Sequence, residues 1–270
     1  MIHAKIKSNY NRKEEIMKTI LACFTALFIC LLSTSGAQAG KIVLANDEWQ
    51  LTNYGFTVNP INDPATYVNN VAKWFTGGSP GNFLAYSSNF GLTGSHLAST
   101  MTTAGHTWNV TMGITFNLAT LLTYDGVFIA GDSADNTVLI NYVNAGGNVY
   151  LAGGTGWGGP VDEAARWNTF LNYFGLGFGS FYNGVQGNIE ISSSHPIFAG
   201  VDHLYQNNGN NALDILLSDP RSEVLISFNG HGLYAIYDSG SVSVPEPSTL
   251  LLLGSGLIGL GYFVRKRMKK

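Results

Sequence analysis

Acidic and aromatic side chains directly follow three apolar runs of the sequence. They are Asp47, Glu48 and Trp49 after residues 41–45, Asp132 and Asp135 after residues 126–130, and Thr155 and Trp157 after residues 148–152. If the runs are parallel strands, their carboxyl ends meet at one edge of a sheet, where open α/β sheets bind ligands. Carboxylates beside two tryptophans could bind a sugar or a divalent cation there. The alternative is that the carboxylates cap helices or stay in solvent, since helix N-termini favour Asp and Glu.

One of these stretches also contains a serine. Gly131-Asp132-Ser133 resembles the nucleophile block of GDSL-type esterases, in which a serine follows a strand. The resemblance implies a secreted hydrolase that uses Ser133. However, no DxxH motif late in the domain supplies the paired acid and base. The alternative role for Ser133 is to cap a helix.

The histidines of the exported part show no metal-binding spacing. No HExxH or HxH pattern occurs among His96, His106, His195, His203 and His231. Structural zinc is therefore unsupported, and we assign no metal ligands and no cofactor. A carboxylate pair for glycoside hydrolysis cannot be assigned either, because the separation that it requires is spatial.

The pattern of apolar and helical segments around these residues predicts an α/β fold. The runs 41–45, 126–130 and 148–152 are continuously apolar, as strands covered on both faces are. Helical patterns follow Asp63-Pro64 and cover residues 138–143 and about 162–176. Strands that alternate with helices predict a doubly wound, mostly parallel sheet with flanking helices.

The last third of the domain has a different pattern. Residues 224–228 and 233–237 are apolar and flank Asn229-Gly230-His231-Gly232. Asn-Gly between two such runs is a strong hairpin signal. We expect an antiparallel hairpin near the C-terminal edge of the sheet.

Three segments together resemble the class I glutamine amidotransferase-like domains, which have a flavodoxin-like fold. They are YDGVFIAGD, LINYVNAGGNVYLAGGTGWGG and HPIFAGV. The family's catalytic members carry a nucleophilic cysteine in a GxCxG turn, but Gly156 stands at that position here. His195-Pro196-Ile197 also lacks the glutamate of the family's His-Pro-Glu. The resemblance thus implies a scaffold without glutaminase chemistry, in which His195 opens a turn.

Composition limits the partners of this domain. Residues 40–244 contain four Lys and Arg against fourteen Asp and Glu, a net charge of −10. An acidic domain is a poor partner for phosphate backbones, so nucleic acid is not expected. Both cysteines, Cys23 and Cys30, precede this region, so the mature domain has no disulfide.

The N-terminal 39 residues read as a signal peptide. Lys18 begins a charged flank, residues 20–32 are apolar, and Ala37-Gln38-Ala39 is a small-residue cleavage site. We expect the secretion machinery to export the chain and a signal peptidase to cut after Ala39.

The C-terminus has three parts in a fixed order. A Pro245-Glu246-Pro247 motif precedes the uncharged segment 250–264, and a basic end follows with Arg265, Lys266, Arg267, Lys269 and Lys270. An ordinary single-span anchor is one interpretation, although the segment is short for a bilayer. The order of the parts resembles the PEP-CTERM sorting signal of Gram-negative exported proteins. That resemblance implies recognition and cleavage by an exosortase-type membrane protease.

These observations give a domain map and a functional hypothesis. The map is a signal peptide at 1–39, an exported α/β amidotransferase-like domain at 40–240, and a linker plus sorting tail at 241–270, with a transmembrane helix at 250–264. The protein is expected to be tethered transiently to the inner membrane and then to reach the outer envelope or the extracellular matrix. There the non-catalytic domain would bind a glycan, an exopolysaccharide or a surface protein. The alternatives are the Ser133 hydrolase and a passive structural component of a biofilm.

Overall fold

The centre of the fold is a mostly parallel β-sheet. A computed structural model describes residues 40–156, 158–213 and 219–240 of the chain. Five parallel strands lie in the order β1, β5, β4, β2, β3. Their bounds are β1 Lys41–Ala45, β2 Asn82–Ala85, β3 Thr107–Val110, β4 Gly126–Ala130 and β5 Asn148–Ala152. β4 and β5 are buried along their whole length, as their continuous apolar sequences require.

An antiparallel hairpin extends this sheet beside β1. It consists of β10, Ser222–Phe228, and β11, His231–Asp238, which pairs with β1. Asn229 and Gly230 connect the strands with φ angles of 50° and 79°. Such left-handed conformations suit a two-residue Asn-Gly turn. The hairpin predicted from this dipeptide is thus present at the sheet edge.

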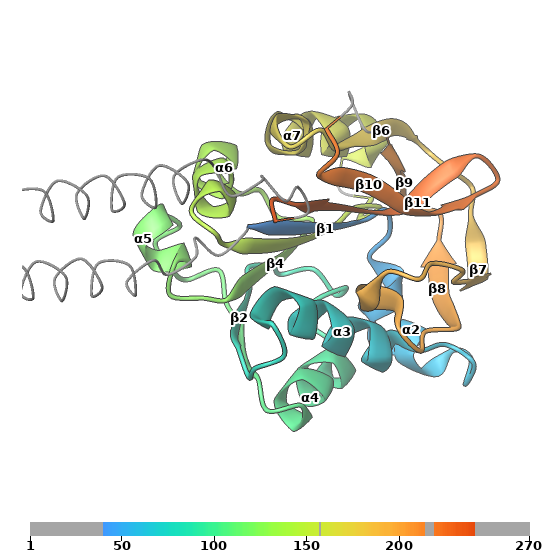
Figure 1. Cartoon of the computed structure of the whole chain (residues 1–270). Helices are drawn as coiled ribbons and strands as arrows, with labels where there is room; N and C mark the ends of the chain where they lie inside the picture. Colours follow the sequence, from blue (N-terminus) through green and yellow to red (C-terminus); the bar gives the residue numbers. More distant parts are fainter. Residues whose placement is uncertain (1–39, 157, 214–218, 241–270) are drawn as a thin grey trace, which may run out of the picture. The chain divides into compact units, whose positions relative to one another are not determined.

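Helices cover both faces of the sheet (Figure 1). α3 Pro64–Thr76 and α4 Ser95–Thr103 pack on the face that carries Val43 and Phe128. α5 Leu118–Leu121, α6 Asn136–Asn144 and α7 Gly159–Tyr173 pack on the face that carries Ile42 and Val127. Alternate residues of each strand therefore enter opposite cores, because side chains alternate across a strand. The expected mixed α/β architecture is confirmed.

The helix starts differ in detail from the sequence prediction. α7 begins at Gly159, three residues before the expected Asp162, because Gly158 adopts a left-handed conformation with φ 80° and Pro160 fits the first turn. Asp63 occupies the N-cap position of α3 but makes no side-chain cap bond there. Its carboxylate accepts instead from the amide of Asp202, at 2.8 Å.

Two small antiparallel sheets lie between α7 and the hairpin in the chain. β6 Gly177–Tyr182 pairs with β9 Asn210–Leu213, and β7 Gln186–Glu190 pairs with β8 His203–Asn207. The 3-10 helix η2, Pro196–Phe198, connects β7 to β8. Near the start of the domain, η1 Trp49–Leu51 and α2 Asn53–Thr57 directly follow β1 in the sequence. Of these elements, η1, α2 and the turn between β8 and β9 lie at the carboxyl ends of β1 and β5.

Several predictions concern parts of the chain outside the described residues. They are the signal peptide at 1–39, Trp157, the motif Pro245-Glu246-Pro247, the segment 250–264 and the basic end. Within the described ranges, we found no helix with the length and apolar character needed to cross a membrane.

Candidate functional site

The carboxyl ends of the parallel strands bring the predicted residues to one edge of the sheet. Asp47 follows β1, Asp132 follows β4 and Thr155 follows β5. Since these strands run parallel side by side, their following loops lie next to one another. The chemistry of this edge depends on how each side chain is bonded there.

Asp47 is fully buried and acts as an acceptor for two backbone segments. Its Oδ1 accepts from the amide of Trp49 at 2.7 Å, and its Oδ2 accepts from the amide of Asn207 at 2.6 Å. Burial raises the pKa of this carboxyl group to about 7, although the two amides oppose the shift. Asp47 therefore joins η1 to the end of β8.

Glu163 is the second buried acid at this edge, and the sequence analysis did not select it. Its carboxylate accepts from the Gly154 amide at 2.8 Å and from the Thr155 hydroxyl at 2.6 Å, and it also bonds the Asn210 amide group. Burial raises its pKa. Because the Thr155 hydroxyl donates to Glu163, its role is to hold the loop after β5 against α7. The signal for Glu163 was its spacing, since it shares the buried face of α7 with Trp167.

The turn between β8 and β9 fills the space at the ends of β1 and β5. A Cβ on Gly209 would lie 1.9 Å from the carbonyl oxygen of Asn46, and one on Gly154 would lie 2.6 Å from the Gly209 Cα. Backbones that approach so closely leave no room for a ligand. This is the edge at which an open α/β sheet usually binds one.

Gly156 and His195 lie at opposite ends of the sheet. Gly156, with φ 69°, belongs to the loop after the carboxyl end of β5. His195 caps η2 by accepting from the amide of Ile197, and its ring contacts Trp74 at 5.2 Å between centroids. The Trp74 carbonyl in turn accepts from Lys41, the first residue of β1. His195 therefore opens a turn, as expected, and does not face Gly156.

The loop after β4 contains Asp132, Ser133 and Asp135. Asp132 accepts from the Ser88 amide at 2.5 Å and the Ser88 hydroxyl at 2.9 Å, which fixes the loop after β2. Asp135 caps α6 by accepting from Thr137 and Val138. The helix cap is thus Asp135 rather than Ser133. Ser133 is exposed, and within the described ranges no side chain hydrogen-bonds its hydroxyl.

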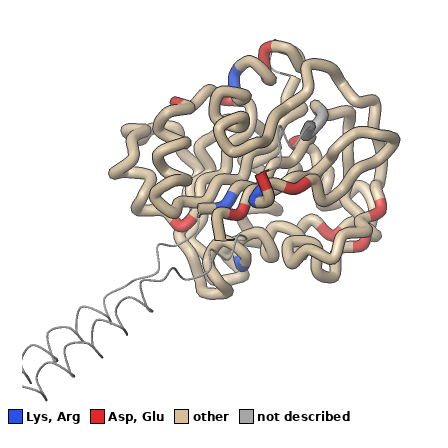
Figure 2. Tube along the Cα trace, turned by 45° about the horizontal axis from the view of Figure 1, so that its top comes forward, with Lys and Arg blue, Asp and Glu red and all other residues tan. Residues whose placement is uncertain are grey.

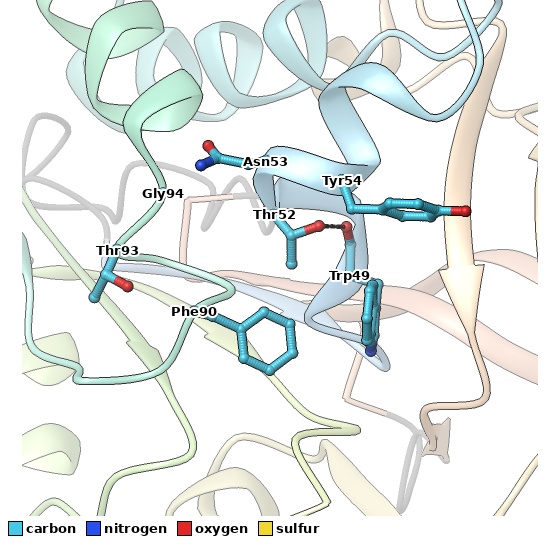
Figure 3. A pocket seen from close by; sticks show the side chains of 7 residues that line it. All are labelled: Trp49, Thr52, Asn53, Tyr54, Phe90, Thr93 and Gly94. Carbon is cyan, nitrogen blue, oxygen red and sulfur yellow. Dashed lines mark hydrogen bonds between the residues drawn. The ribbon is translucent and has the colours of Figure 1, made fainter.

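A pocket with aromatic walls lies beside this closed edge (Figure 3). Its volume is about 280 Å³, and its lining consists of Trp49, Thr52, Asn53, Tyr54, Phe90, Thr93 and Gly94. The Trp49 ring meets those of Phe90 and Tyr54 edge-on, with centroids 5.2 and 5.8 Å apart. Tyr54 and Phe90 are 49% and 48% exposed. Large aromatic rings that remain in solvent beside a hollow are a common feature of binding sites.

Buried polar groups hold the walls of this pocket in place. The Thr52 hydroxyl donates to the Trp49 carbonyl at 2.8 Å (Figure 3) and accepts from the Gly55 amide at 2.9 Å, which caps α2. The loop that carries Phe90 packs on Glu48, because a Cβ on Gly91 would lie 2.9 Å from the Glu48 Cβ. The Glu48 Oε2 is buried without a hydrogen-bond partner, and burial raises the pKa of Glu48 to about 8. Glu48 thus lies buried against the loop that carries Phe90.

Sequence reasoning selected Trp49 but not the other aromatic residues around it. Tyr54 lies in a short helix, Phe90 in the loop after β2, and Tyr205 in β8, with its ring 5.2 Å from that of Tyr54. The available signal was an aromatic residue amid small polar ones, as in Ser88-Asn89-Phe90-Gly91. In the ranges that the structure describes, no group of His, Cys, Asp and Glu is arranged to hold a metal ion.

Comparison with known proteins identifies the tail of the chain. A family model described as the PEP-CTERM protein-sorting motif matches residues 243–267. Comparisons with curated proteins and with solved structures found no match. The sorting signal predicted around Pro245, Glu246 and Pro247 is therefore confirmed. It implies an exported protein of the Gram-negative cell envelope, with an exosortase as processing partner. No match supports an amidotransferase-like body, which stays a prediction.

Proposed function

We propose that this protein is a non-catalytic surface domain that binds extracellular polysaccharide through the Trp49 pocket. The observation that carries the proposal is the cluster of Trp49, Tyr54 and Phe90, which lines a hollow on an exported domain. Sugar rings have faces made of C–H groups, and the electron-rich face of an aromatic ring attracts them. An exported domain meets such polymers in the envelope and the matrix.

The closed edge of the sheet supports binding over catalysis. In this proposal the body is an amidotransferase-like scaffold that has lost its nucleophile, with Gly156 at the position of the cysteine. Gly209 and Asn210 occupy the ends of the strands, and the acids there serve as acceptors for backbone amides. The hydroxyl of Ser133, the alternative nucleophile, makes no hydrogen bond to a side chain among the residues described. The pocket beside the closed edge is then the site for a ligand.

Delivery to the cell surface is the other half of the proposal. The signal peptide 1–39 directs export, and segment 250–264 with its basic end holds the chain in the inner membrane for a time. The exosortase then cuts near the Pro-Glu-Pro motif and releases or transfers the domain. The PEP-CTERM match is the support for this route.

A sedimentation assay on insoluble polysaccharides tests the proposal. The full chain is kept in a detergent without a sugar headgroup and mixed with a panel of polymers, including exopolysaccharide from a host biofilm. We expect at least one polymer to bind, and Trp49→Ala to weaken that binding at least about tenfold. Tyr173→Ala is the matched control, because Tyr173 is 59% exposed on α7 and does not line the pocket.

Three other results would contradict the proposal, and each points to a different function or binding surface of the domain. Equal binding by wild type and Trp49→Ala would remove the pocket from consideration. No binding to any polymer would overturn polysaccharide binding and favour a surface-protein partner or a passive matrix component. Labelling by a serine-hydrolase probe that Ser133→Ala abolishes would establish the hydrolase instead.

A further inference from the structure

The charges around the Trp49 pocket restrict the sugar that it can take. The four basic side chains of the described residues all lie outside the pocket lining. Lys41 donates to Trp74, Arg166 to Gly131 and Arg221 to Asp219, while Lys73 lies in the last turn of α3. Figure 2 shows how few Lys and Arg the trace carries. A uronate or sulfate group would therefore find no cation in this pocket.

The acidic groups nearby reinforce this restriction. Asp47 and Glu48 immediately precede Trp49, and both are buried. Each carboxyl group is either neutral or negative, so neither attracts an anion at any pH. When ionised, each repels an anionic sugar through a medium that screens charge less than water does.

The polar groups of the pocket suit hydroxyl groups rather than charges. The Asn53 Oδ1 accepts from the His96 amide at 3.0 Å, at the start of α4. Its Nδ2 makes no hydrogen bond to another described residue and is left to donate to a sugar oxygen. Thr93 adds an exposed hydroxyl across the hollow from Trp49 (Figure 3). A volume of about 280 Å³ is at the small end for ligand pockets and suits a single sugar ring.

We infer that the Trp49 pocket selects an uncharged pyranose unit of a neutral polysaccharide. This inference rests on the proposed function and deepens it. The C–H face of the ring packs on the aromatic walls, and its hydroxyl groups meet Asn53 and Thr93. Selection against acidic polymers follows from the missing cation.

Affinity electrophoresis with three soluble polymers tests the inference on the full chain at physiological salt. The polymers are a neutral β-glucan, the polyuronate alginate and the polyamine chitosan. We expect the glucan to retard the protein most, and Trp49→Ala to weaken that retardation at least about tenfold. Alginate should cause no retardation that depends on Trp49.

A charge-introducing variant makes the test specific to the pocket. Thr93→Lys places a cation on the pocket wall and should strengthen alginate binding about fivefold while glucan binding falls. Thr103→Lys is the matched control, since Thr103 is also exposed but ends α4 about 12 Å from its start. The control substitution should change neither glucan binding nor alginate binding.

The outcomes separate this inference from the proposed function. Binding of alginate or chitosan that is stronger than that of the glucan and lost in Trp49→Ala would overturn the selectivity, while polysaccharide binding would stand. An equal gain in alginate binding from both lysine variants would also overturn it, because general charge would then explain the gain. Absence of Trp49-dependent retardation by all three polymers would overturn the selectivity and the pocket together.

Discussion

Asp47 and Glu48 are neighbours in the chain and support different parts of the site. Asp47 joins Trp49 to Asn207 through backbone amides, whereas Glu48 packs under the loop that carries Phe90. Burial raises the pKa of Asp47 to about 7 and that of Glu48 to about 8, from ordinary values of 3.8 and 4.5. The pocket therefore rests on two acids that are costly to ionise in the folded domain.

This cost predicts a pH dependence of stability. Between about pH 4 and 8, Asp47 and Glu48 hold more protons in the native domain than in the unfolded chain, where such carboxyl groups ionise near pH 4. Their contribution to the free energy of unfolding should therefore be highest at the acidic end of that window and decrease as the pH rises. Glu48→Gln removes one of these titrations and should stabilise the domain by about 1 kcal/mol or more at pH 8, with less effect at pH 5. Urea unfolding at both pH values measures this.

Glu190→Gln provides the control for this measurement. Glu190 is exposed at the end of β7, so its substitution should change stability little at either pH. If Glu48→Gln and the control shift the unfolding midpoint equally, burial of Glu48 does not govern the pH dependence.

At the residue scale, the sequence predicts where a residue lies along an element better than it predicts whether its side chain is buried. Asp47, Glu48 and Trp49 were expected at the end of a strand, because a continuous apolar run directly precedes them. Their burial was not predictable, since the group that covers Asp47 comes from Asn207, 160 residues later in the chain. Glu163 was missed for a related reason. The groups that donate to its carboxylate come from other elements, from Gly154 after β5 and from Asn210 in β9.

The β8–β9 turn is the element that decides what this sheet edge can do. Gly209 fits against the Asn46 carbonyl oxygen only because it has no Cβ, which would lie 1.9 Å away. Gly209→Ala should therefore force the turn away from β1 and destabilise the domain by about 3 kcal/mol. Thermal unfolding measures the loss, and hydrogen exchange at Asn207 should rise as its bond to Asp47 breaks.

A substitution at a second glycine serves as the control, because it introduces backbone strain without a steric clash. Gly184 has φ 71° and open space around its Cβ position. Gly184→Ala tests the left-handed strain alone and should cost about 1 kcal/mol. If Gly209→Ala proves no more destabilising than this control, the turn is not held closely against β1.

Elements with strong local signals were predicted, and those that depend on distant partners were not. β1, β4 and β5 have continuous apolar runs, and the β10–β11 hairpin has an Asn-Gly turn. In contrast, β6 pairs with β9 across more than twenty residues of intervening chain. Their polar and glycine-rich sequences carry no period that indicates a strand. The closed edge and the pocket walls depend on these elements and on loops, so sequence could locate the site but not shape it.

At the scale of the whole molecule, the C-terminal sorting motif indicates where the proposed pocket would work. A pocket for an uncharged sugar is useful only where polymers are present, and the PEP-CTERM match directs the chain to the envelope. The acidic composition of residues 40–244 agrees with this proposal, because a negatively charged domain is expected to repel acidic polymers. Release from the membrane would free the pocket to reach the matrix.

Processing of the tail is the last step in this sequence of events, and it can be observed directly. In a Gram-negative host with an exosortase, mass spectrometry of the mature protein should find a C-terminus near Pro245-Glu246-Pro247, without residues 250–270. Glu246→Ala should preserve the tail and keep the protein in the membrane fraction, because the protease would no longer recognise the motif. Ser241→Ala, which lies outside the matched residues 243–267, should be processed like the wild type. A mature wild-type protein that still ends at Lys270 would show that segment 250–264 is a permanent anchor.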